Sequence, residues 1–182
     1  YVFACGPWLS KIFPIALKDV IQPTRQEVFF FGTPYGNTDY FEQKTPVWTD
    51  FGEKLWYGIP GADWRGFKVA DDTRGVDFDP TTGDRTPSKE GIKSARKYLE
   101  KRFPGMKNAP LLEARVCQYE NSLDGNYIVD RHPNAENVWV LGGGSGHGFK
   151  LGPGLGEFIA DRVTEKKDVD PFFALSRFNK DA

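Results

Sequence analysis

The stretch NVWVLGGGSGHGFKLGPGLGEFIADRV, residues 137–163, carries the clearest structural pattern in the chain. Its first five residues form an apolar run that predicts a buried strand, and a cluster of glycines follows directly. After the glycines, apolar residues recur at the spacing of one helix face: Leu155, Phe158, Ile159 and Val163. The predicted order is therefore strand, glycine loop, helix. Such a loop can present backbone N–H groups to an anion, but tight turns also need glycine for steric reasons alone.

The residues on either side of this stretch predict further strands. Residues 111–119 and 126–130 read as two strands around a turn formed by Asp124 and Gly125. The tail contains the aromatic segment PFFALSRF, residues 171–178, which we expect to pack back on the body of the protein.

The first part of the chain predicts an antiparallel sheet. Residues 28–31 are apolar in succession, as in a strand that is buried on both faces. Residues 45–50 and 53–59 alternate aromatic and polar side chains, which predicts a hairpin, and residues 64–70 continue the meander. Residues 1–5 read as one more short strand, ended by a glycine and a proline.

One long helix is predicted over residues 87–103. Apolar residues recur there at helical spacing, Thr86 reads as the N-cap, and Pro87 reads as the first helical residue. The fold class that follows is α+β, with helices packed on a mostly antiparallel mixed sheet.

Composition excludes several classes of function. The chain has 182 residues, of which 39% are hydrophobic and 15% aromatic, so it is far from the composition of a disordered protein. Its 24 Lys plus Arg against 25 Asp plus Glu leave a net charge of −1, which favours no nucleic-acid partner. We also expect no membrane partner, because no apolar run approaches the roughly 20 residues that a spanning helix needs.

Cysteines and acidic residues complete these expectations. Cys5 and Cys117 are too few for a disulfide scaffold, so a reducing compartment, the cytoplasm, is the expected location. The acidic stretch 71–86 invites a calcium reading through Asp77 and Asp79, but Gly83 is one place late for a calcium loop and no glutamate closes the frame. We therefore expect no metal.

The sequence of residues 111–165 resembles the C-terminal region of the glycine/D-amino-acid oxidase superfamily, and is most similar to its monomeric sarcosine oxidase-like enzymes. In that group a Cys-x-Tyr strand is followed by an acidic turn, an Ile-Asp-x-His-Pro element, an apolar strand and Ser-Gly-His-Gly-Phe-Lys. This chain has Cys117-Gln-Tyr119, then Asp124, then the similar Ile128-Val-Asp130-Arg-His132-Pro133 element, and then residues 145–150, SGHGFK. The opening YVFACGPW is similar to the late flavin-domain strand of the group.

The resemblance implies a division of the chain and a missing part. Residues 1–9 would be the last-strand piece of an FAD-binding lobe, residues 10–110 a substrate-binding lobe, and residues 111–182 the C-terminal part of the FAD-binding lobe. The dinucleotide fingerprint of the family would lie upstream of Tyr1. We therefore expect a C-terminal fragment that is inactive alone, has an incomplete FAD site and has the N-terminal half of its own chain as a partner.

The resemblance also implies roles for individual residues near the flavin. Cys117 matches the cysteine that forms a thioether to FAD, although a lone cysteine is more often a small buried hydrophobe. Lys68 matches the lysine that assists oxygen reduction at the flavin, although by itself it would read as a surface lysine. The remaining residues implied to bind the cofactor form one loop: Gly144, Ser145, Gly146, His147 and Gly148.

Three residues are implied to bind the substrate. Lys150 matches the lysine that holds the substrate carboxylate, and Tyr57 matches a tyrosine that lines the substrate cavity. Asp72 is a departure, because the resembling enzymes have a histidine there. A carboxylate at this position would repel an acidic substrate but could pair with a substrate ammonium, so sarcosine itself is a doubtful substrate.

The expected function of the intact protein is oxidation of a C–N bond in a secondary or primary amine, such as an amino acid, with oxygen as acceptor. Two alternatives stay open: a flavin dehydrogenase that uses another electron acceptor, and a non-catalytic binding lobe.

Overall fold

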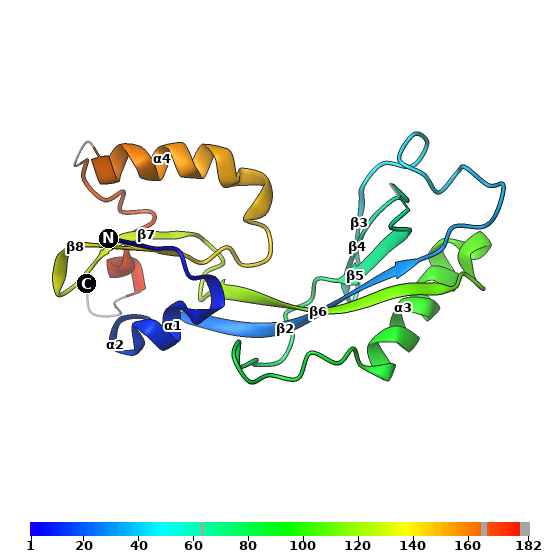
Figure 1. The fold of residues 1–182 in the computed structure, drawn as a ribbon, viewed down its shortest axis with the longest axis horizontal. Helices are drawn as coiled ribbons and strands as arrows, with labels where there is room; N and C mark the ends of the chain where they lie inside the picture. Colours follow the sequence, from blue (N-terminus) through cyan, green and yellow to red (C-terminus); the bar gives the residue numbers. More distant parts are fainter. Residues whose placement is uncertain (63, 165–166, 179–182) are drawn as a thin grey trace. The chain divides into compact units, whose positions relative to one another are not determined.

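The computed structural model describes residues 1–62, 64–164 and 167–178, and these form two compact units (Figure 1). Unit 1 combines Tyr1–Thr24, Asp77–Gly83 and Gln118–Ala182, whereas unit 2 combines Arg25–Val76 and Asp84–Cys117. Each unit is therefore assembled from segments that are distant in the sequence.

Unit 2 is built on a five-stranded sheet with the strand order β3-β4-β5-β2-β6. The pairs β3/β4, β4/β5 and β2/β5 are antiparallel, which confirms the predicted α+β class and the predicted hairpin and meander. Two of the strands, β2 and β6, extend beyond the limits of unit 2 into residues of unit 1. The bounds are β2 Ile21–Phe31, β3 Trp48–Phe51, β4 Leu55–Ile59, β5 Phe67–Asp71 and β6 Leu111–Ser122.

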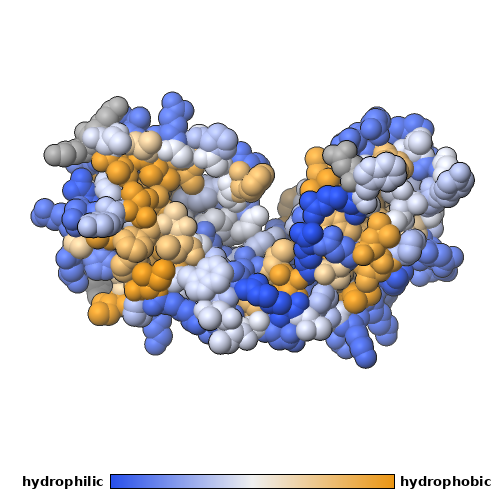
Figure 2. Space-filling view, viewed as in Figure 1, coloured by the Kyte–Doolittle hydropathy of each residue, from blue (hydrophilic) through white to orange (hydrophobic). Residues whose placement is uncertain are grey.

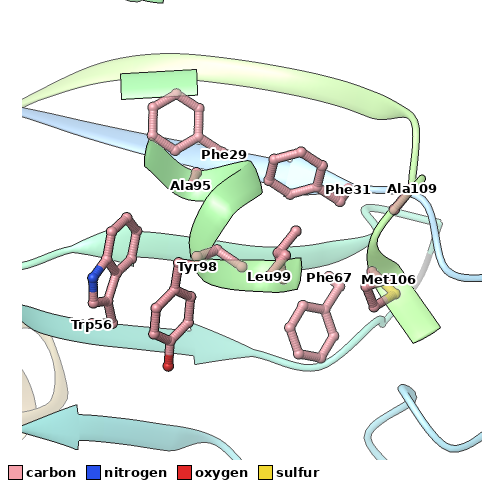
Figure 3. Close-up of a cluster of buried hydrophobic side chains, with 10 residues drawn as sticks. Phe29, Phe31, Trp56, Phe67, Ala95, Tyr98, Leu99, Met106 and Ala109 are labelled. Carbon is pink, nitrogen blue, oxygen red and sulfur yellow. The ribbon is translucent and has the colours of Figure 1, made fainter. Parts of the chain in front are cut away.

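Helix α3, Lys89–Arg102, packs on one face of this sheet (Figure 3). Its apolar side chains Ala95, Tyr98 and Leu99 contact a layer of buried aromatic and aliphatic residues. Because strand side chains alternate between the faces, the residues of this layer are every second residue of their strands. They are Phe29 and Phe31 from β2, Trp56 from β4, and Phe67 and Val69 from β5.

The predicted cap of this helix was wrong by two residues. The helix begins at Lys89 and its N-cap is Ser88, whose Oγ accepts a hydrogen bond from the Gly91 N–H at 2.9 Å. The hydroxyl of Ser88 also donates to Glu27 Oε2 at 2.7 Å, and its backbone N–H donates to Glu27 Oε1 at 2.5 Å. Because Glu27 on β2 accepts both hydrogen bonds, Ser88 rather than Thr86 is the N-cap of α3. A local sequence pattern does not reveal this contact.

Unit 1 contains a three-stranded sheet with the order β1-β8-β7. Strand β1 (Val2–Phe3) runs parallel to β8 (Ala135–Gly142), and β7 (Ile128–His132) is antiparallel to β8. The two strands predicted around Asp124 and Gly125 exist, but they do not pair with each other. Strand β6 joins the sheet of unit 2, where Leu111, Ala114 and Cys117 pack against buried clusters. Strand β7 joins the sheet of unit 1, where Ile128 is part of the core.

Short helices and one long helix complete unit 1. Helices α1 (Leu9–Ile12) and α2 (Pro14–Leu17) bury Leu9 and Leu17 in a core with Ile21, Ile128 and Val140. The predicted C-terminal helix is α4, Gly152–Thr164, preceded by the 3-10 turn η3, Phe149–Leu151. The other 3-10 turns are η1 (Gly6–Trp8) and η4 (Leu175–Phe178) in unit 1, and η2 (Pro104–Met106) in unit 2.

The aromatic segment near the C-terminal end packs back on unit 1, as predicted. The Val129 N–H donates to the Phe173 carbonyl at 3.1 Å, and the Leu175 N–H donates to Asp130 Oδ2 at 2.7 Å. Phe173 also contacts Phe158 of α4 edge to face, with ring centroids 5.3 Å apart.

Asp79, in the acidic stretch 71–86, has hydrogen-bond and ion-pair partners within the protein. Asp79 accepts the backbone N–H groups of Thr81 and Thr82 at 2.8 and 2.9 Å and pairs with Lys11 at 2.6 Å. The hydrogen bond from Lys11 and those two N–H groups hold the pKa of Asp79 well below its usual range. Within residues 1–62, 64–164 and 167–178, no three His, Cys, Asp or Glu side chains gather as a metal site would require.

Large apolar side chains also reach the surface in both units (Figure 2). Phe149, in the stretch after the glycine cluster, and Trp64, in the connection between β4 and β5, are each 100% exposed. None of the helices in the described part of the chain combines the length and apolar character needed to cross a bilayer.

Candidate functional site

Three of the predicted site residues lie on one face of the unit 2 sheet, the face turned away from α3, here called the far face. The alternation that sends Phe29 and Phe31 toward α3 sends Val28 and Phe30 to the far face. There they form a small buried cluster with Ala70, and Tyr57 and Cys117 pack against it.

Lys68 belongs to the same far face. Its neighbour across the β2/β5 ladder is Phe30, and its neighbour across the β4/β5 ladder is Ile59. Its Nζ lies 3.2 Å from the Tyr57 hydroxyl and 4.7 Å from the centre of the Tyr57 ring. The ammonium is thus held at an aromatic surface with a neutral hydroxyl as its hydrogen-bond partner, and it keeps donors for a further ligand.

Cys117 contributes a free thiol to this surface. It is half-buried on β6, the strand that lies beside β2, and it contacts the cluster of Val28, Phe30 and Ala70. Strands β4, β5 and β6 therefore bring Tyr57, Lys68 and Cys117 to one apolar face.

Asp72 lies one residue beyond the end of β5. Its backbone N–H donates to the Leu55 carbonyl at 2.7 Å, which extends the β4/β5 ladder by one bond. The backbone at this position is therefore fixed by the sheet, and the residue is half-buried.

The glycine loop lies in unit 1, between β8 and η3. Its backbone enters the left-handed region at Gly143 (φ 74°), Ser145 (φ 46°) and Gly146 (φ 82°). A Cβ at Gly146 would lie 2.3 Å from the Tyr119 ring, so glycine is required there by space as well as by conformation. The loop is thus shaped for a close approach of backbone to aromatic ring.

Hydrogen bonds attach this loop to β6. The Ser145 N–H donates to the Glu120 carbonyl at 3.2 Å, and the Ser145 hydroxyl accepts the Ser122 N–H at 3.2 Å. The Gly144 N–H donates to Glu120 Oε1 at 3.4 Å. At the far end of the loop, His147 Nε2 lies 3.0 Å from the Gly125 carbonyl oxygen, so the side chain of His147 is positioned by the turn before β7.

Lys150 follows the loop within η3 and is exposed. Among the described residues it forms no ion pair, so its ammonium can receive an anionic ligand. It lies just before the first turn of α4, where unpaired backbone N–H groups also favour negative charge.

A cavity of about 490 Å³ opens beside the glycine loop. Its lining comes from four segments of unit 1: the stretch after β1, residues 118–120 of β6, Tyr127 with the start of β7, and the segment from β8 to α4. The lining residues that matter below are Tyr119, Glu120, Tyr127, Gly144, Gly146 and Gly148.

Two polar residues of this cavity were missed by sequence reasoning. Glu120 Oε2 and the Tyr127 hydroxyl are both buried and have no hydrogen-bond partner among the described residues. Burial raises the pKa of the Glu120 carboxyl, although hydrogen bonds from the loop N–H groups oppose the shift. Glu120 could have been identified from its occurrence in β6, a strand in which most residues are half-buried.

Comparison with known proteins places this arrangement in a family. The family described as FAD dependent oxidoreductase, DAO, matches residues 1–162. The monomeric sarcosine oxidase of Bacillus sp. (strain NS-129) is 31% identical over 100% of this chain and 47% of its own length. The chain therefore spans about half the length of the curated relatives it matches.

Solved structures share the fold. The fructosyl amine:oxygen oxidoreductase (amadoriase I) of Aspergillus fumigatus superposes with a TM-score of 0.76 at 22% identity, over 96% of this chain and 42% of that chain. The L-proline dehydrogenase of P. horikoshii gives a TM-score of 0.73 at 23% identity, over 97% and 46% of the two chains. The family match over residues 1–162, most of the chain, shows that this chain belongs to the DAO family of FAD-dependent oxidoreductases.

Proposed function

We propose that this chain is the substrate-binding lobe and part of the FAD-binding lobe of an amine oxidase that oxidises a C–N bond of an amino acid or related amine and uses oxygen as acceptor. The observation that carries the proposal is the far face, where Tyr57, Lys68 and Cys117 meet on one apolar surface. The relatives are named as sarcosine oxidases, which are FAD-dependent amine oxidases.

The residues present fit an FAD. An isoalloxazine ring needs a flat apolar surface, which the far face offers, and the backbone at Gly146 can approach an aromatic ring closely. In the cavity beside the loop, the buried and unpartnered Tyr127 hydroxyl and Glu120 Oε2 are polar atoms that a ligand could satisfy. Cys117 and residues 144–148 would hold the cofactor, with Cys117 as the covalent link.

When bound, FAD supplies the two-electron acceptor that oxidation of a C–N bond requires. The chain itself supplies charge and orientation. Lys68 holds a positive charge at the far face, where it would stabilise the anion formed as oxygen is reduced. Lys150 would bind the substrate carboxylate, and Asp72 would attract the substrate ammonium, since each side chain carries the charge opposite to that of its ligand group.

The role of Lys68 is tested by reoxidation of the reduced intact protein with oxygen, followed by stopped-flow absorbance. We expect Lys68→Met to slow reoxidation by at least about 100-fold, as for the loss of one preorganised charge at a reacting group. Lys97→Met is the matched control, because Lys97 is exposed on α3. Equal rates in the wild type and both variants would contradict the oxidase proposal.

The covalent link is tested by acid precipitation. We expect the wild-type precipitate to stay yellow, Cys117→Ser to release its flavin, and Cys5→Ser, which removes the other free cysteine, to behave as the wild type. A precipitate that is colourless in the wild type would contradict covalent attachment. Intact protein that is colourless and takes up no FAD would support the alternative of a non-catalytic binding lobe.

A dehydrogenase remains the second candidate, because the fold is shared with a dehydrogenase as well as with oxidases. It predicts slow reoxidation already in the wild type, with no further loss in Lys68→Met, and fast reoxidation by an artificial electron acceptor.

A further inference from the structure

We propose that four lysines of α3 form a docking site for an acidic segment of a partner protein. The partner segment that fits is an extended chain in which a carboxylate recurs at every second residue. This surface lies outside the candidate site and takes no part in the proposed oxidation of an amine. Its members, here called the lysine stripe, are Lys89, Lys93, Lys97 and Lys101.

The lysine stripe follows one side of α3. Its members are four residues apart, so successive lysines lie about 6 Å apart along the helix axis and the stripe is about 18 Å long. At 3.6 residues per turn, the four side chains cover roughly a third of the helix circumference. They lie on the side opposite Ala95, Tyr98 and Leu99, which face the sheet, and all four lysines are exposed.

The other cations of this part of unit 2 have partners within the protein, whereas the stripe does not. Among the described residues, none of the four stripe lysines forms an ion pair or donates a side-chain hydrogen bond. Their ammonium groups are therefore available to an anionic ligand. The internal contacts of their neighbours are Arg96 to the Ala109 carbonyl at 2.9 Å, Arg102 to Asp50 at 2.9 Å and Lys107 to Glu100 at 2.5 Å.

The stripe is a local excess of positive charge on a chain that is otherwise negative. Residues 89–107 hold seven of the 24 Lys plus Arg and two of the 25 Asp plus Glu, a net charge of +5. Because the whole chain has a net charge of −1, the rest of it carries −6. An anionic bilayer or a nucleic acid is a broad polyanion, which this excess of carboxylates would repel. A short acidic segment contacts the stripe alone, so the charge distribution favours it as the partner.

The stripe does not stabilise the helix that carries it. Like charges four residues apart destabilise a helix, and the helix dipole disfavours a cation in the first turn, where Lys89 lies. The stability of α3 comes from its buried face and from its cap at Ser88. Loss of the stripe charges should therefore leave the fold intact.

The spacing of the stripe matches that of an extended peptide. Side chains on one side of an extended chain recur at every second residue, about 6.4–6.8 Å apart, which is close to the spacing of the stripe lysines. Four carboxylates at alternate positions can therefore each meet one ammonium. The far face lies on the other side of the unit 2 sheet from α3, so such a peptide would leave it open.

Fluorescence anisotropy of a labelled peptide tests the site in the intact protein at low salt. The probe is a peptide of four Glu-Ser repeats, and the uncharged control is a peptide of four Gln-Ser repeats. We expect the wild type to bind the acidic peptide at least tenfold more tightly than the uncharged one. A peptide of the same composition with its four glutamates contiguous should bind at least threefold more weakly than the alternating one.

Two variants that each lose four charges separate the stripe from net charge. Replacement of all four stripe lysines by glutamine should weaken binding of the acidic peptide at least tenfold. The matched control replaces four exposed lysines elsewhere by glutamine and should change binding less than twofold. Its positions are Lys11, Lys18, Lys44 and Lys54.

The unfolding temperature of the stripe variant separates docking from a structural role. It should equal or exceed that of the wild type, because no contact within the protein is lost and like charges are removed. A lower unfolding temperature would contradict the proposal. Flavin content and amine oxidation should be unchanged in the stripe variant, so the result does not depend on the proposed function.

Three binding results would overturn the docking site or its partner. Wild type that binds the two repeat peptides equally, or a stripe variant that binds as the wild type does, would overturn the site. Equal binding of the alternating and contiguous acidic peptides would overturn the extended partner. Tighter binding to vesicles that contain phosphatidylserine, or to a DNA duplex, with loss in the stripe variant, would overturn the choice of an acidic protein segment.

Discussion

Replacement of Glu120 by glutamine is expected to stabilise the folded protein at neutral pH. The carboxylate lines the cavity beside the glycine loop, one oxygen accepts the Gly144 N–H at 3.4 Å, and the other is buried without a partner among the described residues. An unsatisfied buried polar atom costs about 1–3 kcal/mol, and a charged one costs more. Glutamine keeps an acceptor for Gly144 and removes the charge, while its amide N–H2 replaces the unpartnered oxygen. Only the extra cost of burying a charge is relieved, so Glu120→Gln should raise the free energy of unfolding by about 1 kcal/mol at pH 7.

The pH dependence of this effect has a definite sign. Burial raises the pKa of Glu120 in the folded protein, so the folded state holds this proton more tightly than the unfolded chain. Between the unfolded and the folded pKa the folded state binds more protons, and stability falls as pH rises. Below the unfolded pKa, about 4.3 for glutamate, both states are protonated and the penalty disappears. The advantage of Glu120→Gln should therefore grow as pH rises from about 4 and level off above the folded pKa.

Urea unfolding followed by circular dichroism at pH 4 to 8 measures this difference. Glu157→Gln is the matched control, because Glu157 is exposed on α4, and it should change stability by less than about 0.5 kcal/mol. The reasoning fails if Glu120→Gln destabilises the protein at pH 7, or if its difference from wild type is the same at pH 4 and pH 8.

Three further changes have defined outcomes. Ser88→Ala removes the cap of α3 and a hydrogen bond to Glu27, and should lower the free energy of unfolding by about 1.5–3 kcal/mol in urea. Leu99→Ala opens a cavity in the core beneath α3, where Leu99 is 1% exposed, and should cost about 2–5 kcal/mol in the same assay. Gly146→Ala places a methyl group against the Tyr119 ring at a φ of 82°, and should lower the flavin content of the purified intact protein at least tenfold.

Each change has a control of the same chemistry. Ser94→Ala lies within α3 away from its cap, Leu112→Ala removes a leucine that is 53% exposed, and Gly154→Ala lies where nothing stands within 4 Å of an added Cβ. These controls should stay within about 0.5 kcal/mol of wild type, and Gly154→Ala should keep its flavin. A control that equals its partner would show that the named contact has no special role.

Most secondary structure could be predicted because it follows from the local periodicity of hydrophobic residues. The alternation of residues 53–59 and the helical spacing of residues 87–103 correspond to β4 and α3. The two errors have one cause. Ser88 is the cap because Glu27, on a strand distant in the sequence, accepts a hydrogen bond from its hydroxyl. Strand β6 does not pair with β7 across the turn at Asp124 and Gly125 because it pairs with β2. Both choices depend on partners that local patterns do not contain.

The candidate site, too, has features that follow from local sequence patterns and features that do not. The glycine loop and its order between strand and helix could be inferred, because a cluster of glycines directly after an apolar run indicates a tight backbone turn. The enclosed hydroxyl of Tyr127 could not, because a hydroxyl side chain has the same sequence signature whether it is solvated or enclosed.

The amino-acid sequence by itself determined the elements of this protein, its family resemblance and the residues that could carry flavin chemistry, since strand and helix periods and motif spacing are local properties. Only the tertiary structure decided which of those residues meet. Tyr57, Lys68 and Cys117 gather on the far face because strand register sets which side chains share a face. Register follows from burying whole faces of a sheet, and that is a property of the entire unit rather than of any single segment.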